Sequence, residues 1–198
     1  PLLVGSLEGQ IGKKSAPVYN RVFMLDADGQ IVGTADKVHL VPFGEYLPMP
    51  YIFQYLEGLT AESGQFAHGQ SHRTIALPDQ DISVGPFICY ESIFPEITRE
   101  LTLLGADILV NTTNDAWFGQ TAAPYQHFAM SIIRAVETGR AVVRAANTGI
   151  SGVIQPSGRI QYMTGLEETA TFVEEVPIHR ETTFYTRFGN SILALCIL

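Results

Sequence analysis

Apolar and polar residues alternate along this chain in short segments that predict strands and helices in turn. Residues 18–26 and 30–35 predict two strands, joined by a turn in which Gly29 can adopt a positive φ. Further strands are predicted at residues 81–89, 106–112, 141–146, 152–156, 160–163 and 170–176. The chain is therefore rich in short apolar segments that need partners in a sheet.

Two segments between these strands have the spacing of helices. Residues 95–104 follow a proline that fits the first turn of a helix. Residues 124–140 predict an amphipathic helix with one apolar face formed by Phe128, Ile132, Ala135 and Val136. Strands that alternate with helices predict one α/β domain with a mixed sheet, whose functional residues lie on loops at strand ends. The prolines between residues 37 and 50 predict an irregular loop there.

The composition and net charge of the chain limit the classes of partner and cofactor that we expect. Of its 198 residues, 46% are hydrophobic and 16% are charged, whereas about 25% charged is typical of soluble domains. The net charge of −8 and the absence of a basic run exclude nucleic acid as an expected partner. The two cysteines form neither a disulfide scaffold nor a zinc-binding pattern, and no metal or organic cofactor is implied.

The last eight residues, 191–198, are apolar at seven positions. They are too short to cross a bilayer, which needs about 20 residues. Two interpretations stay open for this segment: a closing core strand, or the start of a C-terminal transmembrane helix.

Residues 85–91 (GPFICYE) end a predicted strand in a cysteine. A thiol at a strand end can meet a substrate, and its reactivity depends on neighbouring groups that favour the thiolate. A lone cysteine is more often a buried structural residue. Cys89 becomes a candidate nucleophile because of two other segments of the chain.

These segments are residues 36–48 (DKVHLVPFGEYLP) and residues 111–119 (NTTNDAWFG). With residues 85–91, they make the chain resemble the nitrilase, or carbon–nitrogen hydrolase, superfamily. Within it the chain is most similar to the apolipoprotein N-acyltransferases, and residues 125–127, 147–151 and 185–190 extend the resemblance over nearly the whole chain. The resemblance implies an α/β fold, namely an αββα sandwich with mixed sheets, and a Glu–Lys–Cys triad.

By this match, Cys89 is the nucleophile and Lys37 the triad lysine, with Glu45 beside them as a supporting carboxylate. An ammonium near the thiol favours the thiolate and can neutralise the oxyanion of a tetrahedral intermediate. The backbone N–H of Tyr90, just after the nucleophile, is a natural second oxyanion donor. Glu91 lies on the same side as Cys89 and either tunes the site or forms a buried structural pair.

The chain departs from the family pattern at the triad glutamate, which should precede Lys37. Glu8 is the only acidic residue before Asp26, and its surroundings do not match the motif. We therefore expect residues 1–190 to be a catalytic domain truncated at its N-terminus, and this chain alone to be inactive.

The aromatic loop after the strand at 106–112 carries Trp117 and Phe118. These side chains either contact lipid, at a membrane interface or an acyl-chain groove, or anchor the loop in the core. Asn114 is a candidate substrate contact, although Asn114 and Asp115 more often shape turns. His127, in a predicted helix, is expected to be structural.

The resemblance implies transfer of an acyl chain from a phospholipid to the N-terminal amine of a lipid-modified apolipoprotein, through a thioester on Cys89. It places the enzyme in the bacterial inner membrane, with this domain on the periplasmic side. Two alternatives stay open: a soluble amidase or nitrilase that uses the same triad, and a binding domain without catalysis.

Overall fold

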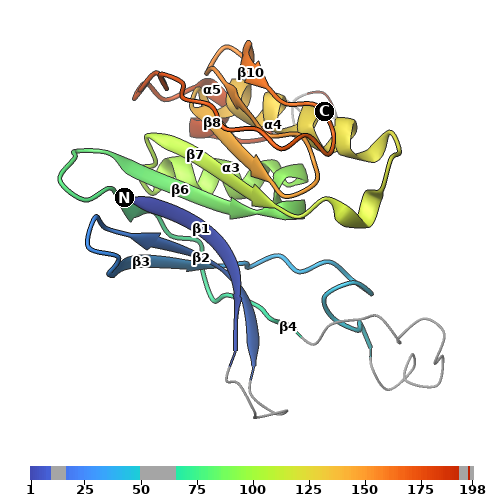
Figure 1. The fold of residues 1–198 in the computed structure, drawn as a ribbon. Helices are drawn as coiled ribbons and strands as arrows, with labels where there is room; N and C mark the ends of the chain where they lie inside the picture. Colours follow the sequence, from blue (N-terminus) through green and yellow to red (C-terminus); the bar gives the residue numbers. More distant parts are fainter. Residues whose placement is uncertain (10–16, 50–65, 192–195, 197–198) are drawn as a thin grey trace.

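The computed structural model describes residues 1–9, 17–49, 66–191 and 196. Two sheets lie face to face, and helices cover the second sheet (Figure 1). In the first sheet, β2 (Val18–Leu25) pairs antiparallel with β1 (Leu2–Glu8) and β3 (Ile31–Asp36), and parallel with the short β4 (Phe66–Ala67).

The second sheet has the strand order β10-β9-β8-β7-β6-β5. Its strands are β5 (Ile75–Ala76), β6 (Ser83–Ile88), β7 (Ile108–Thr113), β8 (Ala141–Ala146), β9 (Gly152–Ile154) and β10 (Ile160–Met163). The central strands β6, β7 and β8 are parallel, and the outer pairs are antiparallel. The central strands are largely buried because both faces of this sheet are covered, and β7 is apolar only in its first half, ILV.

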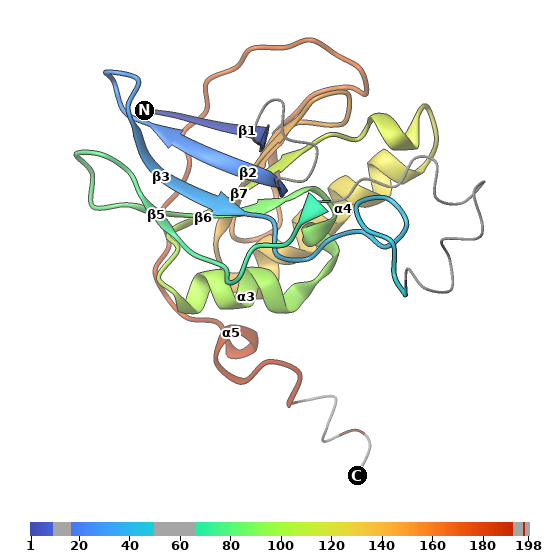
Figure 2. The same cartoon turned by 90° about the horizontal axis from the view of Figure 1, so that it is seen from below.

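Helices α3 (Pro95–Leu103) and α4 (Ala123–Thr138) pack on the outer face of the second sheet, and the short α5 (Phe184–Phe188) lies beside α3, as Figure 2 shows. Both long helices begin with a proline in the first turn. Helix α4 ends at Gly139, whose φ of 65° is the left-handed conformation that glycine accepts without strain.

Two apolar cores hold these layers together. One lies between the second sheet and the helices and includes Phe87, Leu101 and Leu109, each 0% exposed. The other lies between the sheets, where Met24 of β2 packs with Val84 of β6. Of the expected αββα sandwich, the described residues form both sheets and one helical layer.

The predicted strands and helices are confirmed, with one exception. The strand predicted at residues 170–176 is wrong, because this segment pairs with neither sheet. It contacts β10 through side chains: the ring of Phe172 lies 4.2 Å from that of Tyr162, and Gln161 binds the backbone of Glu175 at 2.9 Å. Strands β1, β4 and β5 were not predicted. Within the second predicted helix, however, Val136 lies off the buried face and is 52% exposed.

The segment 191–198 lies outside the described residues, apart from Ser191 and Cys196. Within the part of the chain that the structure describes, no helix is long and apolar enough to span a membrane.

A substitution at Gly85 of β6 tests the packing beneath the strand that leads to Cys89. A Cβ atom there would lie 2.8 Å from Cβ of Ala106 and 3.0 Å from Cδ2 of Leu109. We expect Gly85→Ala to lower the free energy of unfolding by about 1–3 kcal/mol, because the core has no room for the methyl group. Thermal unfolding measures this. Gly165→Ala is the control, because its Cβ would meet only the flexible side chain of Glu168. Equal stability of both variants would contradict tight packing at Gly85.

Candidate active site

Cys89 lies at the junction between β6 and a 3₁₀ helix, η1 (Cys89–Ile93), and is half-buried. Its φ is 52°, a left-handed backbone conformation. In a residue other than glycine this conformation costs about 1–3 kcal/mol and persists only where the surroundings hold it. Such strained turns concentrate at functional sites.

Lys37 follows the last residue of β3, and its side chain is fully buried. Its Nζ lies 2.7 Å from Oε1 and 2.6 Å from Oε2 of Glu45, on the loop that follows. Glu45 Oε2 also accepts the backbone N–H of Val41 at 2.8 Å. The loop is thus folded around one buried ion pair, which the spacing of Lys37 and Glu45 along the chain does not reveal.

The carboxylate of Glu91 joins the two sheets. Its Oε2 accepts the N–H of Ile88 at 2.6 Å, and its Oε1 accepts those of Val38 at 2.8 Å and His39 at 3.0 Å. Glu91 is 1% exposed. One carboxylate therefore ties the residue before Cys89 to the two residues after Lys37.

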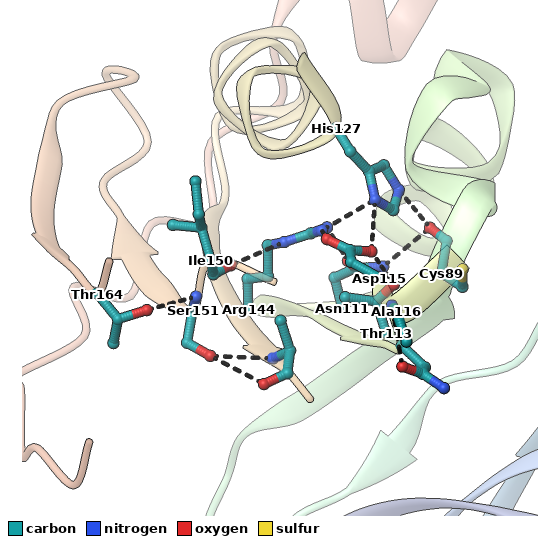
Figure 3. A network of polar contacts seen from close by, with 12 residues as sticks. Cys89, Asn111, Thr113, Asp115, Ala116, His127, Arg144, Ile150, Ser151 and Thr164 are labelled. Carbon is teal, nitrogen blue, oxygen red and sulfur yellow. Dashed lines mark hydrogen bonds and ion pairs between the residues drawn. The ribbon is translucent and has the colours of Figure 1, made fainter. Parts of the chain in front are cut away.

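The Cys89 carbonyl oxygen accepts hydrogen bonds from a buried polar network (Figure 3). His127 Nε2 on α4 lies 3.1 Å from it, and Asn111 Nδ2 on β7 lies 3.4 Å from it. His127 Nδ1 lies 2.9 Å from Asp115 Oδ1, and Arg144 Nη2 on β8 donates to Asp115 Oδ2 at 2.7 Å. Arg144 Nη1 also donates to Asn111 Oδ1, which closes the network into a ring.

The opposite charges of Asp115 and Arg144 compensate each other in the interior of the protein. Burial alone would raise the pKa of Asp115, but the hydrogen bond with His127 and the charge of Arg144 outweigh burial, and the net pKa is lowered. Burial lowers the pKa of Arg144, and the charges of Asp115 and Cys89 oppose that shift.

Sequence reasoning treated Asp115 as a turn residue and His127 as structural, and it did not single out Asn111 or Arg144. One signal was present: Arg144 is the only charged residue of an otherwise apolar strand, AVVRAA. A charge at such a position requires a buried partner. The sequence does not reveal which partner this is, because the ring joins residues from three separate elements and a loop.

The aromatic loop forms a second 3₁₀ helix, η2 (Ala116–Phe118). Trp117 is 74% exposed, so the interpretation of Trp117 as a buried anchor is wrong. Phe118 is half-buried, with its ring 5.7 Å from that of His127. Asn114 Oδ1 accepts the N–H of Ala116 at 3.2 Å and thereby shapes the turn.

No group of three or more His, Cys, Asp or Glu side chains among the described residues is arranged to hold a metal ion. The site instead contains a cysteine at a strained strand end, a buried lysine–carboxylate pair and a ring of polar side chains behind the cysteine. With the paired sheets, these features define an α/β sandwich protein of the nitrilase type.

Comparison with known proteins agrees with this class. The model of the carbon–nitrogen hydrolase family matches residues 1–184, so the chain belongs to this family. The apolipoprotein N-acyltransferase of Geobacter metallireducens is 42% identical over 178 residues, which are 90% of this chain and 34% of the relative. That of Brucella suis biovar 1 is 40% identical over 205 residues, covering 100% of this chain and 37% of the relative.

The resemblance to the carbon–nitrogen hydrolase domain of apolipoprotein N-acyltransferases is thus confirmed, and the chain spans about a third of the length of these relatives. Solved structures show the same fold. Nit3 of Saccharomyces cerevisiae, a member of the nitrilase superfamily, has a TM-score of 0.62 at 22% identity, over 84% of this chain and 56% of that one. A carbon–nitrogen hydrolase from Helicobacter pylori G27 has a TM-score of 0.60 at 17% identity, over 84% of this chain and 58% of that one.

Asp115 gives a prediction of pH dependence. Its pKa is lowered below the ordinary 3.8, so the stability from its ionised form is present above that value and is lost as the pH falls through the lower folded pKa. We expect Asp115→Asn to cost about 3–5 kcal/mol at pH 7, because Arg144 loses its buried partner. The difference from the unchanged protein should narrow as the pH falls below about 4.

Urea unfolding at several pH values measures this difference. Asp81→Asn is the matched control, because Asp81 is fully exposed in its pair with Arg180 and should contribute little. A difference between Asp115→Asn and the unchanged protein that stays constant down to pH 3 would contradict the buried ion pair.

Proposed function

We propose that this chain is the catalytic part of an enzyme that moves a fatty acyl chain from a phospholipid to the N-terminal amine of a lipid-modified apolipoprotein. The observation that carries the proposal is the similarity to apolipoprotein N-acyltransferases over 90–100% of the chain. The site supports it, because Cys89 is half-buried and has a strained backbone. The Glu91 carboxylate binds the residue before Cys89 and also the loop after Lys37.

The reaction proceeds in two steps. In the first, the Cys89 thiolate attacks the ester carbonyl of the phospholipid, and the tetrahedral intermediate expels the lysophospholipid alkoxide, which takes up a proton. In the second, the apolipoprotein amine attacks the thioester, loses a proton to a base and releases the thiolate. The Lys37 ammonium and the Tyr90 N–H stabilise the oxyanion in both steps. The thioester intermediate divides one difficult transfer into two easier ones.

The reaction takes place at the periplasmic face of the bacterial inner membrane. The exposed Trp117 supports this location, because tryptophan side chains favour the interface between lipid and water. Residues 1–190 form the catalytic domain in this proposal, and Trp117, Phe118 and Asn114 lie on the rim that receives the acyl chain.

Cys89 is tested by intact-mass measurement of the full-length protein incubated with phospholipid. We expect a mass increase of one acyl chain, and none after Cys89→Ala. Cys196→Ala is the control, because Cys196 is an exposed free cysteine that should not carry the acyl group. An acyl adduct that persists in Cys89→Ala would exclude Cys89 as the nucleophile.

The acceptor distinguishes transfer from hydrolysis. A lipid-modified peptide with a free N-terminal amine should discharge the thioester much faster than water does. Discharge at the same rate without the peptide would favour the soluble amidase or nitrilase. A full-length protein that never acquires an acyl chain would favour a binding domain.

The base that takes the thiol proton lies outside this chain in our proposal. Both oxygens of Glu45 bind Lys37, and both oxygens of Glu91 accept backbone N–H groups. Neither carboxylate is therefore available to Cys89 without losing these partners.

The isolated 198-residue chain tests this placement. We expect it to form the acyl adduct at least about 100-fold more slowly than the full-length protein, because a general base contributes about 10²–10⁴-fold. Circular dichroism checks that the isolated chain is folded. Equal acylation rates in the two proteins would show that the base lies within this chain.

A further inference from the structure

We infer that His127, held by Asp115 and Arg144, is a positioning residue that sets the direction of the Tyr90 N–H toward the reacting carbonyl. The inference rests on the proposed function, since it needs Cys89 as the nucleophile. The buried ring of Asn111, Asp115, His127 and Arg144 takes no direct part in the proposed reaction steps.

The Cys89 carbonyl is the point on which this ring converges. A carbonyl oxygen only accepts hydrogen bonds, so His127 Nε2 must carry the hydrogen that it shares with Cys89 at 3.1 Å. Asn111 Nδ2 donates to the carbonyl of Phe87 at 3.0 Å and is a second donor to the Cys89 oxygen, at 3.4 Å. Both donors lie behind the nucleophile, within the protein.

The direction of the Tyr90 N–H follows from peptide geometry. The peptide between Cys89 and Tyr90 is planar and trans, so its N–H points opposite to its C=O. Donors that hold the oxygen inward therefore turn the N–H outward. Tyr90 is also in the first turn of η1, where backbone N–H groups have no acceptor within the helix.

The two donors are themselves oriented by one guanidinium. Arg144 Nη1 donates to Asn111 Oδ1, which turns the amide nitrogen of Asn111 toward Cys89. Arg144 Nη2 donates to Asp115 Oδ2 at 2.7 Å and lies 2.9 Å from His127 Nδ1, and the other oxygen of Asp115 lies 2.9 Å from the same ring nitrogen. Arg144 is anchored in turn by the carbonyl of Ile150, at 3.1 Å from its Nε.

Removing the charged and polar side chains of this ring from water has a desolvation cost. Asn111, Asp115, His127 and Arg144 are all at most 4% exposed. Apolar side chains of similar volume would pack there at no electrostatic cost. The ring is instead closed on the carbonyl of Cys89, whose backbone has a positive φ and whose thiol is the proposed nucleophile.

A matched pair of variants tests the inference in the full-length protein. His127→Gln keeps an N–H donor at the end of a side chain of similar reach, and His127→Met has nearly the same length without the donor. We expect His127→Met to lower the rate constant for acylation of Cys89 by phospholipid about 10- to 100-fold, because loss of one oxyanion donor costs about 10²–10³-fold. His127→Gln should recover most of that loss.

Alkylation by iodoacetamide is the second readout. This displacement needs the thiolate but no oxyanion donor, so its rate should change less than about threefold in His127→Met. Equal acylation rates in the Met and Gln variants, or a parallel loss of alkylation and acylation, would overturn the inference.

Asn111→Ser, which removes the other donor, decides the matter if His127→Met does not fold. It should lower the acylation rate about 3- to 10-fold with alkylation unchanged, and an unchanged acylation rate would overturn the inference. If the unchanged protein is not acylated at all, the proposed function fails instead, and the two failures are thereby distinguished.

Discussion

The carboxylate of Glu91 is the interaction on which the site depends. The two sheets carry the candidate lysine and the candidate cysteine on different segments, and apolar packing between sheets does not fix their loops to within an ångström. Glu91 does so by accepting backbone N–H groups from both sides. A buried carboxylate without such donors would be very unfavourable. The requirement to satisfy its oxygens therefore forces the loop after Lys37 against the turn at Cys89.

The turn at Cys89 is held from both sides along the chain. Before it, the N–H of Ile88 binds Glu91, and within it the Cys89 carbonyl binds His127 and Asn111. These contacts compensate for a φ that costs about 1–3 kcal/mol in a residue with a side chain. They hold the backbone on both sides of the thiol, so a change of the turn would break these hydrogen bonds.

Much of the fold followed from the sequence, because apolar periodicity marks the strands and helices of the second sheet clearly. Strand 170–176 failed because its apolar residues face solvent or one aromatic neighbour, and periodicity does not reveal whether a sheet edge is near. For the candidate site, motif resemblance was enough to single out Cys89, Lys37 and Glu45. It missed the ring behind Cys89 because that ring depends on register: Asn111 and Arg144 are direct neighbours across β7 and β8, a pairing that neither strand encodes alone.

The rim of the site differs from its base in a way that suits a lipid substrate. Behind Cys89, the four polar side chains of the ring are buried and paired with one another across β7, β8, α4 and the loop after β7. The loops after β3 and β7 lie at the same end of the molecule, where the parallel strands end (Figures 1 and 2). They carry exposed Met49 and Trp117, and exposed Tyr125 lies in the first turn of α4. A rigid polar base fixes the reacting bonds, and an apolar rim can accept chains of different length and shape because dispersion and apolar burial require no fixed geometry. In the proposed function, the polar base would position the reacting groups and the apolar rim would receive the acyl chain.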